Sequence, residues 1–187
     1  MTQASTSVEN LMASEAASIQ ILTNIRAARR AAADGKPSGR QIMGVFDTKS
    51  TLVYDSDPSA SALRVNATIT QDLDKIYKDL KVGSGHSGWN QYASHYGRQT
   101  MPTTKHNIFD PMTATYKEMW ASIYSKFQMG GTDCSQPILE AMVLAQKGIA
   151  FVKNIYVYTD SETYAGRLHP SAAMKEYRKL VPGAKLI

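Results

Sequence analysis

The sequence predicts an α/β protein with a largely parallel sheet, and three observations lead to that prediction. Segments with the apolar spacing of helices alternate with short apolar segments of strand length. The length of 187 residues suits one domain with a full hydrophobic core. No internal repeat or low-complexity stretch indicates another architecture. We therefore expect a single domain over residues 1–187 that carries one long loop insertion.

Five segments repeat their apolar residues at helical spacing: 11–33, 69–80, 113–127, 137–147 and 170–180. The first collects Arg26, Arg29 and Arg30 near its carboxyl end, where the helix dipole favours cations. The breakers of 34–39 then end that helix. Three of the other helices have a candidate residue for their start: Thr70 as a cap, Asp133 or Ser135 as a cap, and Pro170 in the first turn.

Four short apolar segments fit strands: 42–46, 51–54, 151–158 and 181–187. Only four residues separate the first two, so the second is either the hairpin partner of the first or its continuation. Residues 55–61 predict a loop with a turn at Asp57-Pro58. The later strands each follow a helix, which favours parallel pairing.

Residues 83–112 differ in character and predict a loop insertion. Glycine is dense at the start of this segment, and aromatic side chains are interleaved with basic ones further on. A loop this long in a compact domain is usually functional or disordered. Aromatic stacking combined with cationic contacts often holds single-stranded nucleic acid, and the same composition suits a protein-interaction loop. The candidate contact residues are Trp89, Tyr92, Tyr96, Arg98 and Lys105.

Composition narrows the function classes. A formal net charge of +5 permits contact with nucleic acid or another acidic partner without establishing either. The only cysteine is Cys134, which excludes an intrachain disulfide and a cysteine-based zinc cage and favours a reducing compartment. No apolar run reaches the roughly 20 residues of a spanning helix, and the start of the chain lacks a signal peptide. We expect a cytoplasmic protein with no membrane contact.

No constellation of catalytic residues is visible, so we expect no enzyme. The four histidines have neither metal-ligand spacing with a cysteine nor a partner serine on a nucleophile elbow. The glycine-rich stretch at 83–88 lacks the Gly-Lys-Ser/Thr ending of a phosphate-binding loop.

Oxygen-bearing side chains gather in two segments, 129–135 and 158–166. The first is a glycine turn followed by threonine, aspartate and serine before a helix, and the second follows an apolar strand. Hydroxyl and carboxylate oxygens at strand ends and helix starts suit a divalent cation such as Mg²⁺. Asp133 and Glu162 are acidic neighbours for which helix capping or surface charge is the simpler role.

These motifs carry a family resemblance. Gly130-Gly-Thr-Asp-Cys-Ser135, the segment 156–166, His169-Pro170 and Glu176-Tyr-Arg-Lys179 resemble the von Willebrand factor A-like domain of the Ro autoantigen (TROVE) ribonucleoprotein family. The resemblance is dense over residues 129–187. It implies a doubly wound, mostly parallel sheet with a metal-ion-dependent adhesion site at its carboxyl edge. Because the first strand and the end of that fold are not evident, it also implies a split or partial form of the domain.

The family site takes an Asp-x-Ser-x-Ser loop, a threonine and a further aspartate. Carried over, the threonine is Thr132 and the last aspartate is Asp160, and Ser5 and Ser7 supply the serines while Gln3 replaces the first aspartate. The cofactor implied is Mg²⁺, or Mn²⁺ or Ca²⁺, and a neutral Gln3 should weaken its binding. A rival alignment, which we disfavour, uses Asp47-Thr-Lys-Ser-Thr51 as the first loop.

The resemblance therefore implies a non-enzymatic binding module that docks a partner protein through a divalent cation. That partner could also complete the sheet, because an open strand edge invites strand addition. RNA contact would come directly or through a partner. The alternative is a structural or assembly protein with a degraded metal site, which uses its long loop and open sheet edges for intersubunit contacts.

Overall fold

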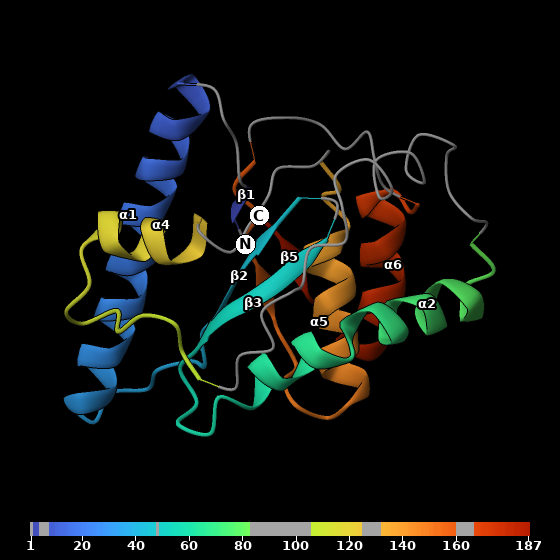
Figure 1. Ribbon diagram of the computed structural model, residues 1–187. Helices are drawn as coiled ribbons and strands as arrows, with labels where there is room; N and C mark the ends of the chain where they lie inside the picture. Colours follow the sequence, from blue (N-terminus) through green and yellow to red (C-terminus); the bar gives the residue numbers. More distant parts are fainter. Residues whose placement is uncertain (1, 4–7, 48, 83–105, 125–131, 160–166) are drawn as a thin grey trace.

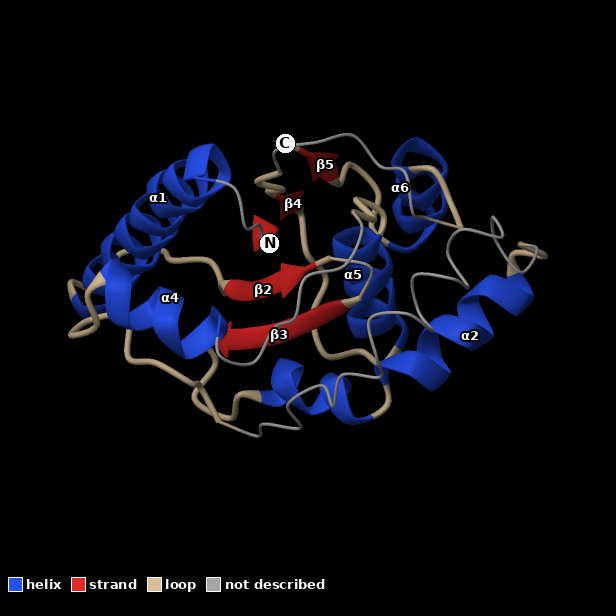
Figure 2. Ribbon diagram, turned by 45° about the horizontal axis from the view of Figure 1, so that its top comes forward, coloured by secondary structure: helices blue, strands red, loops and turns tan. Residues whose placement is uncertain are grey.

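The computed structural model describes residues 2–3, 8–47, 49–82, 106–124, 132–159 and 167–187, and it is a mixed α/β structure with small sheets. Helices lie on both sides of a central hairpin, so the described residues form three layers (Figure 1 and Figure 2). The amino- and carboxyl-terminal ends of the chain lie near each other. No helix in these ranges is both long and apolar enough to cross a membrane.

The central sheet has the strand order β1-β2-β3. Strand β2 (Ile42–Phe46) pairs antiparallel with β3 (Ser50–Asp55), with an irregularity between Met43 and Gly44. Both strands are almost entirely buried, as expected for strands covered on both faces. The short β1 (Thr2–Gln3) runs parallel to the carboxyl end of β2. Of the two arrangements left open for 51–54, the structure has the hairpin.

Helices α1 (Val8–Ala33) and α4 (Tyr116–Tyr124) cover one face of the hairpin. Leu22 and Ile25 of α1 and Met119 of α4 pack against the strands, together with Phe109, whose ring stacks on Tyr54. At the end of α1, the backbone N–H of Gly35 donates to Ala32 and that of Lys36 to Ala31, with Gly35 at a φ of 70°. A left-handed glycine lets these bonds close the helix, as the breakers of 34–39 predicted.

The opposite face carries the larger core. It is covered by η1 (Ser61–Ala67), α2 (Ile69–Asp79), α5 (Gln136–Gln146) and α6 (Pro170–Leu180). Helix α5 is central, and every one of its residues from Gln136 to Ala145 is buried. A helix that is apolar on all sides belongs inside a protein, and α5 fits that rule with two polar exceptions discussed below.

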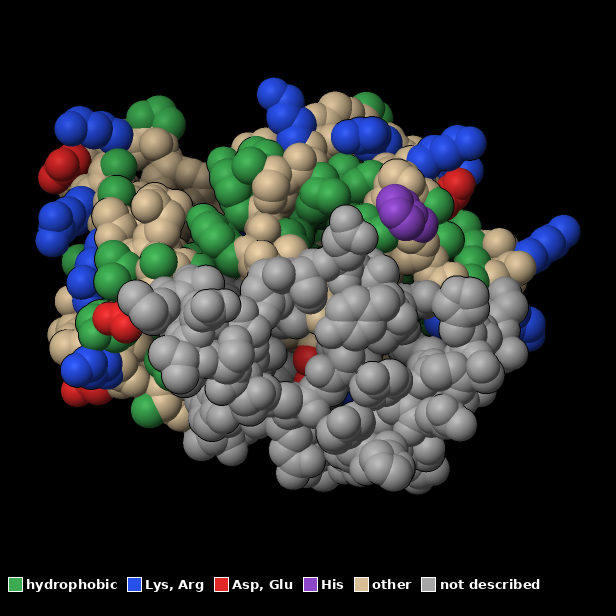
Figure 3. Space-filling view, turned by 90° about the horizontal axis from the view of Figure 1, so that it is seen from above, with side chains coloured by type: hydrophobic (Ala, Val, Ile, Leu, Met, Phe, Trp, Pro, Cys, Tyr) green, Lys and Arg blue, Asp and Glu red, His purple; other side chains and the backbone are tan. Residues whose placement is uncertain are grey.

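A second, two-stranded sheet lies beyond α5, where β4 (Asn154–Ile155) pairs parallel with β5 (Lys185–Leu186). The register puts Tyr156 beside Ile187, on the face opposite Ile155. Ile155 is buried against α5 and α6, whereas Tyr156 and Ile187 are 49% and 57% exposed. Figure 3 shows hydrophobic side chains gathered on this side of the molecule, between the α1 and α6 sides.

The helices agree with the sequence predictions in type and position, and α6 agrees at both ends. Three predictions were wrong. The strand expected over 151–158 spans only 154–155, and the one expected over 181–187 spans only 185–186. The residue before α2 is Thr68 rather than Thr70. The two parallel pairs do not join into one sheet within the described ranges, so a continuous doubly wound sheet stays a prediction.

Candidate functional site

Three separate parts of the chain meet where β2 ends. The backbone N–H of Asp133 donates to the carbonyl of Asp47 over 2.9 Å, which ties the start of α5 to the end of β2. The Cys134 Sγ lies 4.0 Å from the Thr159 Oγ1, which brings the chain after β4 to the same place. Ligands of open α/β sheets bind at the carboxyl ends of parallel strands, so this edge is the candidate site.

The carboxylate of Asp133 organises the start of α5. Its Oδ1 accepts hydrogen bonds from the Ser135 backbone N–H (3.0 Å) and the Ser135 hydroxyl (2.6 Å), and its Oδ2 accepts one from the Gln136 Nε2 (3.0 Å). Burial raises the pKa of Asp133, and these hydrogen bonds oppose that rise. With both oxygens engaged, Asp133 holds the loop before α5 in shape; the helix itself begins after Ser135 without a side-chain cap, so the expected helix cap at Asp133 or Ser135 is not formed.

Thr132 is the only predicted metal ligand among the described residues. It is fully buried at the carboxyl edge, directly before Asp133. Ser5, Ser7 and Asp160 lie outside the described residues, and so do all five predicted contact residues of the insertion: Trp89, Tyr92, Tyr96, Arg98 and Lys105. In the described ranges, no group of three or more His, Cys, Asp or Glu residues is arranged to hold a metal.

The topology discriminates between the two alignments of the first loop. Gln3 pairs with Phe46, so β1 and β2 end at the same edge, and the chain runs from β1 into α1. Asp47, in contrast, begins a hairpin turn, and its Oδ1 accepts a hydrogen bond from the Lys49 backbone N–H. A strand-to-helix connection at the carboxyl edge is what the family loop requires. This favours the alignment through Ser5 and Ser7 over the one through Asp47.

Comparisons with known proteins support the family resemblance over the carboxyl-terminal part of the chain. Residues 100–187 match the Ro60 vWA domain. The chain is also 42% identical over 83 residues to the RNA-binding protein RO60 of Deinococcus radiodurans. That alignment covers 42% of this chain and only 15% of the RO60 protein. No solved structure matches the chain.

Within the Ro60-like part, the structure places two polar residues that sequence reasoning missed. Gln136 and Glu140 are 2% and 0% exposed on α5, one turn apart. The Gln136 Nε2 donates to Asp133 and, over 3.3 Å, to the Tyr77 hydroxyl, which fixes the amide and leaves its Oε1 without a partner among the described residues. The missed signal was the all-round apolar character of 137–145, which leaves no solvent face for Glu140.

Glu140 is a fully buried carboxyl group. Desolvation raises its pKa to about 7, and the nearby Ser50 hydroxyl lowers it in part. Within the described residues, neither Glu140 carboxyl oxygen nor the Ser50 hydroxyl has a hydrogen-bond partner of normal geometry. Glu140 is therefore a neutral acid at low pH and a buried charge above neutrality, two turns from the candidate site.

Proposed function

We propose that this chain is a non-enzymatic binding module of a Ro-like ribonucleoprotein system, which docks a partner protein through a divalent cation at the carboxyl edge of its sheet. The observation that carries the proposal is the meeting of three segments at that edge. Asp47, the start of α5 and Thr159 come together there, and the flanking sequence matches the Ro60 vWA domain. The complete doubly wound sheet of that domain class is part of the proposal.

The residues fit a hard cation by their chemistry. Ser5, Ser7 and Thr132 would supply hydroxyl oxygens and Asp160 a carboxylate, which are ligands that Mg²⁺ and Mn²⁺ prefer. The described carboxylates at this edge, Asp47 and Asp133, already accept hydrogen bonds from the backbone. Negative charge at the site would therefore come from Asp160. With so little protein charge, a bound cation would keep a strong affinity for an acidic side chain of the partner.

The first test is thermal unfolding with added Mg²⁺, Mn²⁺ or Ca²⁺. A cation that binds only the folded chain, present at tenfold its dissociation constant, stabilises it by about 1.4 kcal/mol. For a chain of this size, we expect that gain to raise Tm by roughly 3–5 °C. Asp160→Asn and Thr132→Ala should abolish the rise, whereas Thr132→Ser should keep it because it retains the hydroxyl. Thr70→Ala, an exposed position on α2, is the matched control.

Gln3→Asp adds the reverse test. It returns a carboxylate to the first loop, so the metal concentration that gives half of the Tm rise should be lower than for the natural sequence. A Tm that no cation moves, in either sequence, contradicts the cation site. A rise that survives both Asp160→Asn and Thr132→Ala contradicts the ligand set.

A second candidate function is that of an assembly protein that contacts other subunits through its sheet. It is favoured by the small β4–β5 sheet, whose face with Tyr156 and Ile187 is about half exposed. Parallel strands are normally covered on both faces. In this case, light scattering after size exclusion should detect an oligomer of the natural chain and a monomer of Ile187→Lys. The size of the oligomer should not depend on added cations. A monomer at all concentrations contradicts self-assembly.

A further inference from the structure

The outer edge of β3 is covered by two asparagine side chains. β3 is the last strand in the order β1-β2-β3, so one side of its backbone faces away from β2 (Figure 2). In an antiparallel pair, alternate residues turn their N–H and C=O groups away from the neighbouring strand. Such an edge is a template on which a strand of another chain can pair, so the groups that cover it decide whether pairing is possible.

Asn66 binds the middle of this edge. Its Oδ1 accepts the backbone N–H of Leu52 over 2.9 Å, and its Nδ2 donates to the Leu52 carbonyl over 2.8 Å. Asn66 lies in η1 and is 4% exposed. A side-chain amide carries the donor and the acceptor of a peptide group. Asn66 therefore makes the two bonds that one residue of a paired strand would make.

Asn107 binds the end of the same edge in the same way. Its Oδ1 accepts the backbone N–H of Asp55 over 2.8 Å, and its Nδ2 donates to the Asp55 carbonyl over 3.0 Å. Between the two asparagines, the Ile108 backbone N–H donates to the Val53 carbonyl over 3.4 Å. Two separate segments of the chain thus cover this edge as a paired strand would.

The sequence of β3 offers no protection of its own against strand pairing. Residues 51–54 are Thr-Leu-Val-Tyr, without a charged residue or a proline. Edge strands are commonly protected by charged residues or proline, and an apolar edge without them is an aggregation site. The protection of β3 therefore has to come from the residues that cover its edge.

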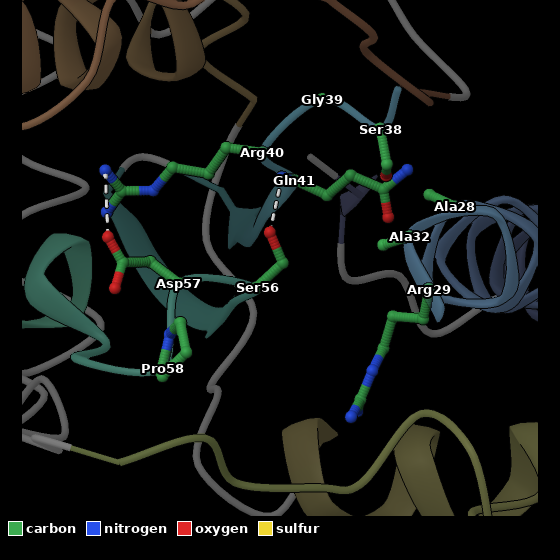
Figure 4. Close-up of a pocket in the computed structure, with 10 residues that line it drawn as sticks. All are labelled: Ala28, Arg29, Ala32, Ser38, Gly39, Arg40, Gln41, Ser56, Asp57 and Pro58. Atoms are coloured by element: carbon green, nitrogen blue, oxygen red, sulfur yellow. Dashed lines mark hydrogen bonds and ion pairs between the residues drawn. The ribbon is translucent and has the colours of Figure 1, made fainter. Parts of the chain in front are cut away.

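The end of β3 is held in place by contacts other than those of Asn107. The Gln41 backbone N–H donates to the Ser56 hydroxyl over 2.8 Å, and both residues line a pocket of about 610 Å³ between α1 and the turn after β3 (Figure 4). The Arg40 guanidinium makes two bonds to the Asp55 carboxylate. Asn107 is itself exposed, so water could reach the Asp55 backbone in its absence. Its two bonds are therefore not required to fix or to satisfy the end of the strand.

We propose that Asn66 and Asn107 close the β3 edge of the sheet to strand addition. They keep the chain from pairing with a second copy of itself along β3, and they exclude a partner's strand from the same edge. A partner that completes the sheet would therefore add its strand on the other side of β2. This role is independent of the proposed cation site, because neither asparagine is among its residues.

The test compares two double variants by light scattering after size exclusion at rising protein concentration. Asn66→Ala with Asn107→Ala removes both amides and leaves the edge bare. Asn66→Ala with Asn107→Lys removes the same hydrogen bonds but places a cation on the edge, which blocks pairing. We expect the first variant to reach about twice the mass of the natural chain, because two β3 edges would pair across a twofold axis. The second should keep the natural mass.

The controls separate an open edge from a loss of stability. Both double variants lose the same bonds, so their Tm should fall by a similar amount while only one of them associates. Asn24→Ala is the matched substitution, because Asn24 is an exposed asparagine on α1 whose side chain accepts a bond from Gln20. It should leave the mass unchanged. Far-UV circular dichroism checks folding. If the substitution of the buried Asn66 prevents folding, Asn107→Ala and Asn107→Lys as single variants give the same comparison.

The contact must also be shown to run along β3. Adding Ile187→Lys to the double alanine variant should leave its association unchanged, because that residue lies on the β4–β5 sheet. An association that Ile187→Lys removes would contradict the proposal. A folded double alanine variant that keeps the natural mass at every concentration would do so too. So would a lysine variant that associates as strongly as the alanine variant, because association would then follow lost stability.

Discussion

Replacing Glu140 with glutamine should remove a large part of the pH dependence of stability. Glu140 is completely buried in α5, and burial raises the pKa of its carboxyl group from 4.5 to about 7. The unfolded chain exposes the group, which then ionises near 4.5. Between these two values the folded chain holds a proton that the unfolded chain has lost. Stability must therefore fall as the pH rises through this window.

The magnitude follows from the two pKa values. The difference between 7 and 4.5, at about 1.36 kcal/mol for each pH unit, gives roughly 3 kcal/mol. This stability is fully present below pH 4.5, is lost progressively up to pH 7, and is absent above it. Asp133, whose pKa is also raised by burial, acts in the same direction and is left unchanged in the variant.

The assay is urea unfolding followed by far-UV circular dichroism at several values between about pH 4.5 and pH 8. Glu140→Gln has nearly the same volume and no charge, so its curve should be flatter than that of the natural sequence. The two chains should differ least at pH 4.5 and most at pH 8, where Glu140→Gln should be the more stable. Glu118→Gln is the control, because Glu118 is an exposed cap whose pKa is lowered by Thr115. Parallel curves for the natural chain and Glu140→Gln would refute the reasoning.

Two further predictions concern buried polar contacts. Arg40→Met should destabilise the fold by about 3 kcal/mol in urea unfolding, because it leaves the fully buried Asp55 without its two-bond partner; a loss below about 1 kcal/mol would contradict this. Asp133→Ala should cost about 1–3 kcal/mol, since donors of Ser135 and Gln136 lose their acceptor. The half-exposed Asp110→Ala is its control, and equal losses in both would rule out a special role for Asp133.

Local signals explain why the helices could be predicted. Pro170 suits a first helical turn, His169 caps it through its Nδ1, and α6 begins there as expected. The cap of α5 was not predicted correctly, because Asp133 accepts the backbone N–H of Ser135 in the preceding loop and the helix begins without a side-chain cap.

Strand length and burial could not be predicted, because both depend on distant segments. The apolar run 151–158 shows that a strand is possible there, but its partner β5 pairs over only two residues, so β4 ends at Ile155. The pocket lined by Gln41 forms only where three separate segments of the chain meet, so no local sequence pattern could predict it. The roles of Thr132, Asp160, Ser5 and Ser7 as metal ligands were all assigned by resemblance, and all four stay predictions.

The pocket lined by Gln41 and the proposed cation site lie at opposite ends of β2, so a substitution in the pocket should not affect cation binding. Gln41 precedes β2 and Asp47 follows it, so six residue steps of about 3.3 Å separate them by roughly 20 Å. Substitutions that far apart without shared partners normally act independently. Gln41→Met should therefore leave the rise of Tm with added cation intact, and a rise that is lost in Gln41→Met would contradict this independence.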